Sequence, residues 1–367
     1  VISPILPVTV LLTSTGKKSK AQERKNMDLV ESSIKIIKDN QHESGAYIAS
    51  PNFSQYGFSW LRDSSFIAEA MLYTGERESA YRYFQWVEGV LERYSEKIIT
   101  TLSKKTEAIS IEDYLPTRYR LDGKLNNDNW ENAQIDGYGT YLWALNAYSK
   151  KAGFPFKVQP IQYITEYLEK LWQLPCYDAW EEEKSAVHTS TLISVAAGLK
   201  AAEELLQKKT AWEQVYRYIE QKHTKDGRLI KSTLNDGVDA SLIWAICPFK
   251  LWDKEHPLIK KTIQQIEHDL NFNGGVKRYL KDSYYGGGSW ILLSANLGDY
   301  YRQTDQTEKH KQIKDWIERQ ATHKQELPEQ VKEHLLFEDY YEKWVQKWGE
   351  IAVPLLWSHG NYLKMVG

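Results

Sequence analysis

This sequence contains few cysteines and has a net charge close to zero. Its 367 residues include two cysteines, too few for a disulfide framework. Lysine and arginine together number 47 and the acidic residues 49, which gives a net charge of −2. Because a nucleic acid backbone or an anionic membrane attracts positively charged surfaces, we expect neither to be a partner. A small, neutral molecule is the expected partner, and the oligomeric state stays open.

A membrane-spanning run is also missing. Residues 1–12 are apolar but contain two prolines and follow no basic region, which argues against a signal peptide and against a spanning helix. We expect a cytoplasmic protein, while the start at Val1 leaves a removed leader open. The composition, 42% hydrophobic and 26% charged, is that of an ordered globular chain. We expect residues 1–26 to form an extension and residues 27–367 to form one domain.

Motifs that bind metals or phosphate are absent. The nine histidines form no H-x-x-x-H or His-Cys cluster, so we expect no zinc site. Residues 126–139 alternate asparagine and aspartate but lack the glycine and glutamate of a calcium loop. The glycine triplet at residues 286–288 lacks the lysine of a phosphate loop. There is no G-x-S-x-G elbow for a serine nucleophile. We therefore expect no metal and no cofactor.

Aromatic residues, by contrast, are abundant. The chain has 14 tryptophans and 24 tyrosines, more than a core of this size requires. Flat aromatic faces are what proteins stack against sugar rings. Large helical domains also use aromatic side chains to fill the gaps between helices. Composition alone leaves both interpretations open.

Helical periodicity dominates the chain, and two kinds of helix alternate along it. A helix with a charged stripe faces water, whereas a helix that is apolar nearly all round is buried. The charged helices are expected at residues 27–39, 76–96, 158–172, 210–223, 258–270 and 307–320. The uncharged helices are expected at residues 63–74, 135–148, 187–199, 238–247, 287–298 and 351–363. Six such hairpins predict an all-α fold, an (α/α)6 barrel of six inner and six outer helices, whereas the repeats of an open solenoid are usually tighter and more regular.

The connections between these helices differ in length and composition. Loops that run from an outer helix to the next inner helix are long and rich in aromatic, acidic and glycine residues. In a double ring, all of these loops emerge at the same end, so their polar residues converge on one mouth. Because binding and catalytic residues concentrate on loops held by a rigid scaffold, we expect the functional site at this mouth.

The third of these loops contains three consecutive carboxylates, Glu181, Glu182 and Glu183, directly after Trp180. A carboxyl group against an aromatic wall is partly desolvated, which raises its pKa and suits it to act as a general acid. Repulsion from the two neighbouring carboxylates would add to this rise. The alternative is structural, because acidic residues also stabilise the N-terminus of a helix.

The first of these loops ends in the adjacent residues Arg62 and Asp63. Asp63 is well placed to cap the following helix, with Arg62 as its ion-pair partner. The same pair can bind neighbouring hydroxyl groups through charge-assisted hydrogen bonds. The residues alone favour the cap.

Seven short motifs, taken in order, resemble the glucoamylase family, the family fifteen glycoside hydrolases. They are S-W-L-R-D-S-S-F, W-E-N-A-Q-I-D-G-Y-G, Y-D-A-W-E-E, D-A-S-L, K-R-Y-L-K-D-S-Y-Y-G-G-G-S-W, L-P-E-Q and P-L-L-W-S-H. Each is weak alone, but together they cover most of the chain from residue 56 onward. The resemblance implies an (α/α)6 barrel that acts as an inverting, exo-acting α-glucosidase.

The resemblance also implies roles for individual residues. Glu181 matches the general acid and Glu329 the general base, two carboxyls that an inverting enzyme holds roughly 6.5–9.5 Å apart. Arg62 and Asp63 match the residues that bind hydroxyl groups of the terminal glucose. The remaining substrate contacts implied by the resemblance are Tyr56, Trp130, Trp180, Glu182, Arg278 and Trp290.

The length of the chain narrows the range of expected substrates. The roughly twenty-five residues before the first helix leave no room for the accessory domains that many members of the family carry. We therefore expect a short oligosaccharide rather than starch, with the α-1,4, α-1,6 and α,α-1,1 linkages all open. The alternatives are an α,α-trehalase, a non-catalytic sugar-binding regulatory barrel, and a phosphorolytic enzyme of similar fold.

Overall fold

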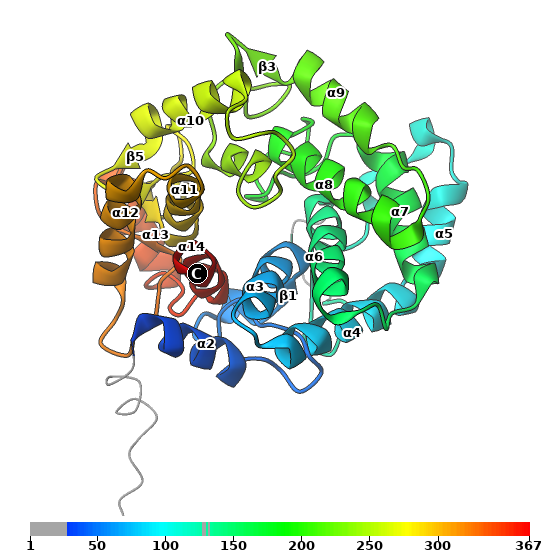
Figure 1. Cartoon of the computed structure of the whole chain (residues 1–367), viewed down its shortest axis with the longest axis horizontal. Coiled ribbons are helices and arrows are strands. Elements are labelled where there is room, and N and C mark those ends of the chain that lie inside the picture. Colours follow the sequence, from blue (N-terminus) through cyan, green and yellow to red (C-terminus); the bar gives the residue numbers. More distant parts are fainter. Residues whose placement is uncertain (1–27, 127–129, 131–132) are drawn as a thin grey trace, which may run out of the picture.

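The computed structural model describes residues 28–126, 130 and 133–367, so the extension expected at residues 1–26 lies outside the described residues. Its helices form two concentric rings (Figure 1). The inner ring consists of α3 (Leu61–Tyr73), α6 (Asp136–Ala152), α8 (Thr189–Leu206), the 3-10 helix η4 (Ala240–Ala245), α11 (Ile291–Gln303) and α14 (Leu356–Val366). The outer ring consists of α2 (Leu29–Asp39), α4 (Arg77–Arg93), α7 (Val158–Leu171), α9 (Trp212–Lys222), α10 (Pro257–Leu270) and α12 (Thr307–Gln320). The predicted all-α double ring is confirmed.

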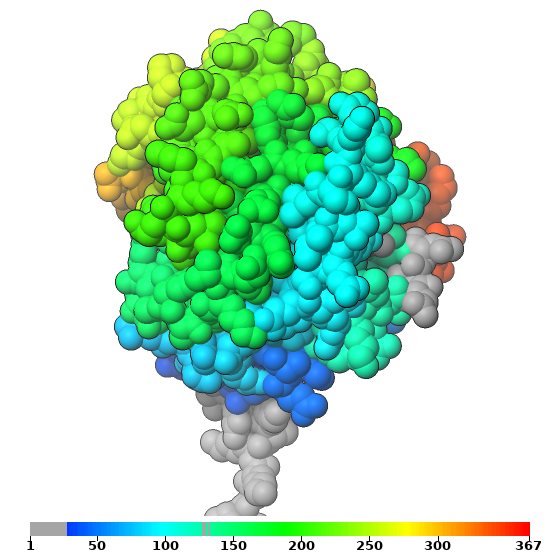
Figure 2. Space-filling model, turned by 90° about the vertical axis from the view of Figure 1, so that its right-hand side faces the viewer, coloured from blue at the N-terminus to red at the C-terminus, as the bar shows by residue number. Residues whose placement is uncertain are grey.

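Contacts between neighbouring helices close the inner ring. Each inner helix contacts the next one along the chain, and the last inner helix, α14, returns to contact the first, α3. The outer helix α2 lies against α14, so the two ends of the described chain meet. Figure 2 shows the outer ring from the side, where α5 (Ser95–Ser103), α7 and α9 form the cyan-to-green wall.

The sequence of each helix explains its ring. In α8, every residue from Thr189 to Leu199 is buried, and the first charged residue is Lys200. In α12, by contrast, only Ile313, Trp316 and Ile317 are buried, and charged residues cover the remaining surface. Burial on all sides therefore follows from the lack of charge, as the alternating pattern predicted.

Two glycines let α6 and α8 cross closely. A Cβ atom added to Gly139 would lie 2.4 Å from the carbonyl oxygen of Ser194. A Cβ atom added to Gly198 would lie 2.4 Å from the carbonyl oxygen of Gly139. Side chains at either position would clash with backbone, so the distance between these two inner helices depends on glycine.

An aromatic cluster fills the axis of the inner ring. Phe66 stacks on Trp357 with ring centroids 5.3 Å apart and also contacts Trp244 and Phe249. Trp143 packs edge-on against Phe249 at 5.1 Å. These side chains occupy the centre of the barrel, so part of the aromatic excess serves the core.

Short strands connect the loops at one end of the barrel. They are two residues long and comprise β1 (Ser59–Trp60) paired with β2 (Arg118–Tyr119), β3 (Thr224–Lys225) paired with β4 (Arg228–Leu229), and an antiparallel sheet of β5 (Asn271–Phe272), β6 (Gly275–Val276), β7 (Ser289–Trp290) and β8 (Gln330–Val331). Trp290 pairs with Gln330, which ties the fifth outer-to-inner loop to the sixth. Within the described residues, no helix is both long and apolar enough to cross a membrane.

Several helix ends lie a few residues from the expected positions, and three elements differ in kind from the helices expected. The fourth inner segment forms six residues of 3-10 helix rather than an α-helix, and it ends shortly before Pro248, which has no backbone N–H and disfavours a helical conformation for Cys247. The helix expected at residues 76–96 ends at Arg93, and a separate helix, α5, follows. An additional helix, α13 (Glu338–Trp348), lies in the sixth outer-to-inner loop.

Candidate active site

The outer-to-inner loops surround a cavity of about 700 Å³, a size typical of ligand pockets. It lies at the N-terminal ends of the inner helices, where the sequence predicted a mouth. All ten predicted site residues line it, namely Glu181, Glu329, Tyr56, Arg62, Asp63, Trp130, Trp180, Glu182, Arg278 and Trp290. Side chains from five different loops and helices therefore converge, as expected for a double ring.

The carboxylate of Glu181 is held by two indole groups. Trp60 Nε1 donates to Glu181 Oε1 at 2.5 Å, and Trp130 Nε1 donates to Glu181 Oε2 at 2.6 Å. The Arg62 guanidinium lies 4.0 Å from the same carboxylate. Burial raises the pKa of Glu181 to about 7, although Arg62 and the two indoles oppose the rise. The group is therefore a carboxyl that is partly protonated near neutral pH.

The other carboxylates of the third loop do not surround Glu181 as the sequence suggested. Glu182 accepts a hydrogen bond from Arg278 Nη2 at 2.7 Å and another from the Tyr279 hydroxyl. Glu183 is exposed. The acidic group that adds to the rise in the pKa of Glu181 is instead Asp63, which comes from α3.

Neither acidic group caps a helix, although the ion pair expected between Arg62 and Asp63 is present. Helix α8 begins at Thr189 with His188 at its N-cap, so Glu181 lies in the loop well before the helix. Helix α3 begins at Leu61 with Trp60 at its N-cap, which places Asp63 within the first turn rather than at the cap. The carboxylates are therefore available to a ligand in the cavity.

Arg62 is fixed by three partners. Its Nε lies 3.2 Å from Asp63 Oδ1, and its Nη1 donates to Gln134 Oε1 at 3.2 Å and to Asp136 Oδ2 at 3.1 Å. The guanidinium also lies over the Trp357 ring, 5.3 Å from its centroid. Burial raises the pKa of Asp63 to about 6, which Arg62 opposes. The pair forms a rigid polar wall of the cavity.

Glu329 is positioned by backbone bonds on both sides. Its N–H donates to the Ala352 carbonyl at 3.0 Å, and its carbonyl accepts from the Ile291 N–H at 3.2 Å. The Tyr56 hydroxyl donates to Glu329 Oε1 at 2.9 Å. Burial raises the pKa of Glu329 to about 8, whereas the Tyr56 hydrogen bond and the Arg278 charge lower it.

Tyr284 belongs to the same group, although the sequence did not single it out. Its hydroxyl lies 2.7 Å from the Tyr56 hydroxyl and 3.5 Å from Glu329 Oε2. The adjacent Tyr285 points away from this group and binds Glu350 at 2.9 Å. Nothing in the motif distinguishes the two tyrosines, because the turn η5 (Tyr284–Gly286) decides which one faces the cavity.

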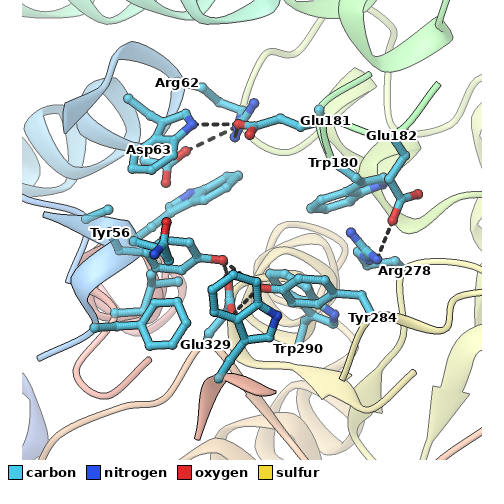
Figure 3. Close-up of a pocket in the computed structure, with 18 of the residues that line it drawn as sticks. Tyr56, Arg62, Asp63, Trp180, Glu181, Glu182, Arg278, Tyr284, Trp290 and Glu329 are labelled. Carbon is cyan, nitrogen blue, oxygen red and sulfur yellow. Dashed lines mark hydrogen bonds and ion pairs between the residues drawn. The ribbon is translucent and has the colours of Figure 1, made fainter. Parts of the chain in front are cut away.

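The two predicted catalytic carboxyls lie on opposite sides of the cavity (Figure 3). Glu181 lies with Arg62 and Asp63 on one side, and Glu329 lies with Tyr56 on the other. An open space between them separates the two groups. Such an arrangement can protonate one side of a bound molecule while activating water on its other side.

Arg278 forms a third wall of the cavity. Its Nη2 lies 2.5 Å from Asp282 Oδ1 and 2.7 Å from Glu182 Oε1. The guanidinium also lies over the rings of Trp180 and Trp290, 5.2 Å from each centroid. Trp180 and Trp290 therefore pack against a fixed charge, unlike Trp244 in the core.

Helix α13 was not predicted, yet it lines the cavity. Trp344, Lys347 and Trp348 form this part of the lining, and no residue of the helix is fully buried. The sequence carries a signal for this helix, because its apolar residues recur at helical spacing from Tyr340 to Trp348. Among the residues that the structure describes, no group of three or more histidine, cysteine or acidic side chains is arranged to hold a metal ion.

Comparison with known proteins identifies relatives across the chain. The model of the family "Glycosyl hydrolases family 15" matches residues 24–348. Isomaltose glucohydrolase from Kribbella flavida is 37% identical over 350 residues, which cover 92% of this chain and 91% of that protein. Trehalase 1 from Sulfolobus acidocaldarius is 25% identical over 241 residues, which cover 62% of this chain and 42% of that protein.

Solved structures of glycosidases are also similar over nearly the whole chain. A wild-type glycosidase structure superposes with a TM-score of 0.87 at 36% identity and covers 96% of this chain and 98% of that chain. A glycosidase variant in complex with glucose has the same TM-score and coverage at 35% identity. A bacterial glucoamylase complexed with acarbose shares the fold, with a TM-score of 0.71 at 17% identity, and covers 94% of this chain and 55% of that chain.

Proposed function

The chain belongs to glycosyl hydrolases family 15 and is a glycoside hydrolase, and from this premise we propose that it releases glucose from the non-reducing end of short α-glucosides. We further propose that the reaction inverts the anomeric carbon, so that the product is β-glucose. The observation that carries the proposal is the position of Glu181 and Glu329 on opposite sides of one cavity.

Glu181 is the general acid of this proposal. It donates its proton to the glycosidic oxygen as the bond to the anomeric carbon breaks. The burial that raises its pKa to about 7 keeps the proton available near neutral pH. The two indole groups that donate to its oxygens then stabilise the carboxylate that remains after the transfer.

Glu329 is the general base. It takes a proton from a water molecule, which attacks the anomeric carbon on the face opposite the leaving group. The hydrogen bond from Tyr56 supports this role, because it favours the ionised form that can accept a proton. Attack from the opposite face converts an α-glycosidic bond into β-glucose, so both roles are tested by the anomer released.

The terminal glucose is proposed to bind deep in the cavity. Arg62 and Asp63 present charged hydrogen-bonding groups there, and Arg62 is held rigidly by Asp136. Hydrogen bonds to the sugar that strengthen as positive charge develops at the anomeric carbon would lower the barrier. Trp180 and Trp290 supply apolar faces for the sugar ring.

We propose isomaltose and short isomalto-oligosaccharides as substrates. The similarity to an isomaltose glucohydrolase extends over nine-tenths of both chains, which supports the α-1,6 linkage over the others. An α,α-trehalase remains the second candidate, supported by similarity to a trehalase over 62% of this chain at lower identity.

The anomer of the released glucose provides the direct experiment. Purified protein is mixed with isomaltose, maltose or trehalose, and the anomeric proton signals are followed by NMR before mutarotation. We expect the glucose from the non-reducing end to appear as the β-anomer, with the highest kcat/KM on isomaltose. The leaving glucose keeps its own configuration, which is an equilibrium mixture of anomers in isomaltose and maltose and α in trehalose. Initial α-glucose in excess of that contribution contradicts inversion, and a higher kcat/KM on trehalose supports the second candidate.

A further inference from the structure

A buried lysine links two of the loops that form the cavity. Lys231, in the loop that follows β4, is 9% exposed. Its Nζ donates to Asp178 Oδ2 at 3.1 Å and to Asp239 Oδ2 at 2.6 Å. Asp178 comes from the third outer-to-inner loop and Asp239 from the fourth, and both are almost fully buried. Among the described residues, no other lysine or arginine nitrogen lies within 4.0 Å of these two carboxylates.

One of these carboxylates organises the turn that carries Glu181. Asp178 Oδ1 accepts the backbone N–H of Trp180 at 3.1 Å and that of Glu182 at 3.0 Å. The carbonyl of Asp178 accepts the backbone N–H of Glu181 at 3.0 Å. Asp178 therefore satisfies three consecutive N–H groups, with Glu181 in the middle.

This turn needs such support because its backbone is strained. Glu181 has a φ of +64°, in the left-handed region that a residue with a side chain adopts only at a cost in free energy. A strained conformation persists only where its surroundings enforce it. Asp178 supplies that enforcement, and its buried charge is in turn neutralised by Lys231.

The second carboxylate holds the neighbouring side chain. Asp239 Oδ2 accepts the Trp180 indole N–H at 3.0 Å, beside the contact with Lys231. The other oxygen, Asp239 Oδ1, accepts the backbone N–H of Ser241 at 2.9 Å at the start of η4. Lys231 thus fixes the backbone on one side of Glu181 through Asp178 and the tryptophan on the same loop through Asp239.

We propose that Lys231 is a positioning residue for proton donation by Glu181. Without Lys231, two buried carboxylates lack their cation, and each must take up a proton or move. The turn at Glu181 then relaxes, and the carboxyl leaves the glycosidic oxygen that it must protonate. The inference rests on the proposed role of Glu181, whereas Lys231 itself is not among the residues that line the cavity.

The test compares two substrates, of which only one needs proton donation by Glu181. Lys231→Met is compared with wild type on isomaltose and on α-glucosyl fluoride, whose fluoride leaves without being protonated. Because general acid catalysis contributes about 10²- to 10⁴-fold, we expect kcat on isomaltose to fall at least about 100-fold. On the fluoride we expect a loss of less than about tenfold.

Two further variants serve as controls. Lys364→Met removes a partly buried lysine that pairs with Glu69 between α14 and α3, away from the cavity, and should leave both activities unchanged. Lys231→Arg keeps the buried positive charge. This variant should therefore fold, and it allows the test even if Lys231→Met fails to fold. Since a planar guanidinium cannot reproduce the contacts of an ammonium group, we expect the same selective loss on isomaltose with a smaller factor.

A spectroscopic measurement makes the result independent of the proposed function. The indole N–H signals of Trp60 and Trp130 report their hydrogen bonds to Glu181, and that of Trp316 reports a distant bond to Glu333 at 2.9 Å. We expect the first two signals to shift in Lys231→Met and the third to stay. Equal losses on both substrates, or unchanged Trp60 and Trp130 signals, would overturn the role of Lys231. A wild-type protein inactive on both substrates would instead overturn the proposed function.

Discussion

At the scale of single residues, the site brings together carboxyl groups that burial holds partly protonated. Burial raises the pKa of Glu181 to about 7 and that of Glu329 to about 8. The proposed reaction needs the first group protonated and the second ionised. Burial favours the first requirement and opposes the second, which the Tyr56 hydrogen bond and the Arg278 charge support, so the fraction of molecules with both groups in the required state depends on pH.

The rate should have a bell-shaped pH profile centred near neutrality. The acidic limb of kcat/KM reports ionisation of the base, and the basic limb reports loss of the acid's proton. Because both groups titrate near neutral pH, the limbs belong to the coupled pair and the optimum is expected between about 7 and 8. Initial rates on isomaltose from pH 4 to pH 10 measure it. An acidic limb near 4.3, the value of an ordinary glutamate, would contradict the effect of burial.

The burial of Glu329 lowers the free energy of unfolding above pH 4.5. The ordinary pKa of Glu329 is 4.5 and its folded value is about 8, so between these values the folded state binds more protons than the unfolded state. Stability therefore falls as pH rises through this window. Glu329→Gln removes the cost and keeps an acceptor for Tyr56, so we expect its melting temperature to exceed that of wild type at pH 8.5 and to match it at pH 4.5. Calorimetry measures both, with Glu308→Gln on the exposed face of α12 as control.

Substitution of the two carboxyls should have different consequences for different leaving groups. Glu181→Gln should lose about 10²-fold or more on isomaltose but retain most activity on α-glucosyl fluoride, which needs no proton donor. Glu329→Gln should lose activity on both substrates, since each requires an activated water molecule. Steady-state kinetics of both variants give the comparison. Equal behaviour of the two variants would contradict the assigned roles.

The sequence predicted which residues line the site but not how they are held. Glu181 and Arg278 were found because the resemblance assigns roles to these positions in the motifs. Trp60 and Tyr284 lie in motifs too but, like Lys231, were assigned no role, since their roles depend on contacts with residues far away in sequence, such as the bond from Trp60 to Glu181. A hydrogen-bond partner that comes from another loop leaves no local pattern.

At the scale of the elements, charge distribution along each helix was sufficient to predict its ring. The 3-10 helix η4 and the helix α13 were not predicted, for different reasons. The segment at η4 is apolar like an inner helix, and only Pro248 signals that it stops early. The pattern of α13 was visible, but a thirteenth helix did not fit a regular repeat of twelve.

The crossing of α6 and α8 should be intolerant of side chains. Gly139→Ala places a methyl group against the α8 backbone, so we expect a loss of about 1–3 kcal/mol and a lower melting temperature. Gly89, inside α4, has open space around it and serves as the matched control. Gly89→Ala should stabilise the protein by up to about 1 kcal/mol, because alanine favours helix. Equal effects of the two substitutions would show that the crossing is not tight.

Helix α13 should contribute to binding of the leaving sugar. Trp348 lines the cavity and is 42% exposed, so Trp348→Ala is expected to raise KM for isomaltotriose by about three- to tenfold while kcat changes less. Tyr340 lies on the same helix, is 49% exposed and does not line the cavity. Tyr340→Ala should therefore leave KM unchanged. A loss confined to kcat after Trp348→Ala would contradict a role in binding.

At the scale of the whole molecule, we propose that residues 27–367 fold as one unit. The closed inner ring supports this, because every inner helix has inner neighbours on both sides. A variant that lacks residues 1–26 should unfold in a single calorimetric transition at the same temperature as the full chain. Two transitions, or a markedly lower melting temperature, would contradict this domain assignment.

The contacts of α14 with α3 and α2 also bear on how the protein is made. Helix α3 is buried along most of its length, and α14, one of its two neighbours in the ring, leaves the ribosome after every other described helix. During synthesis the apolar flank of α3 is therefore uncovered until α14 has emerged. Chaperones that shield such surfaces have most to protect just before α14 emerges, when the inner ring lacks only this helix.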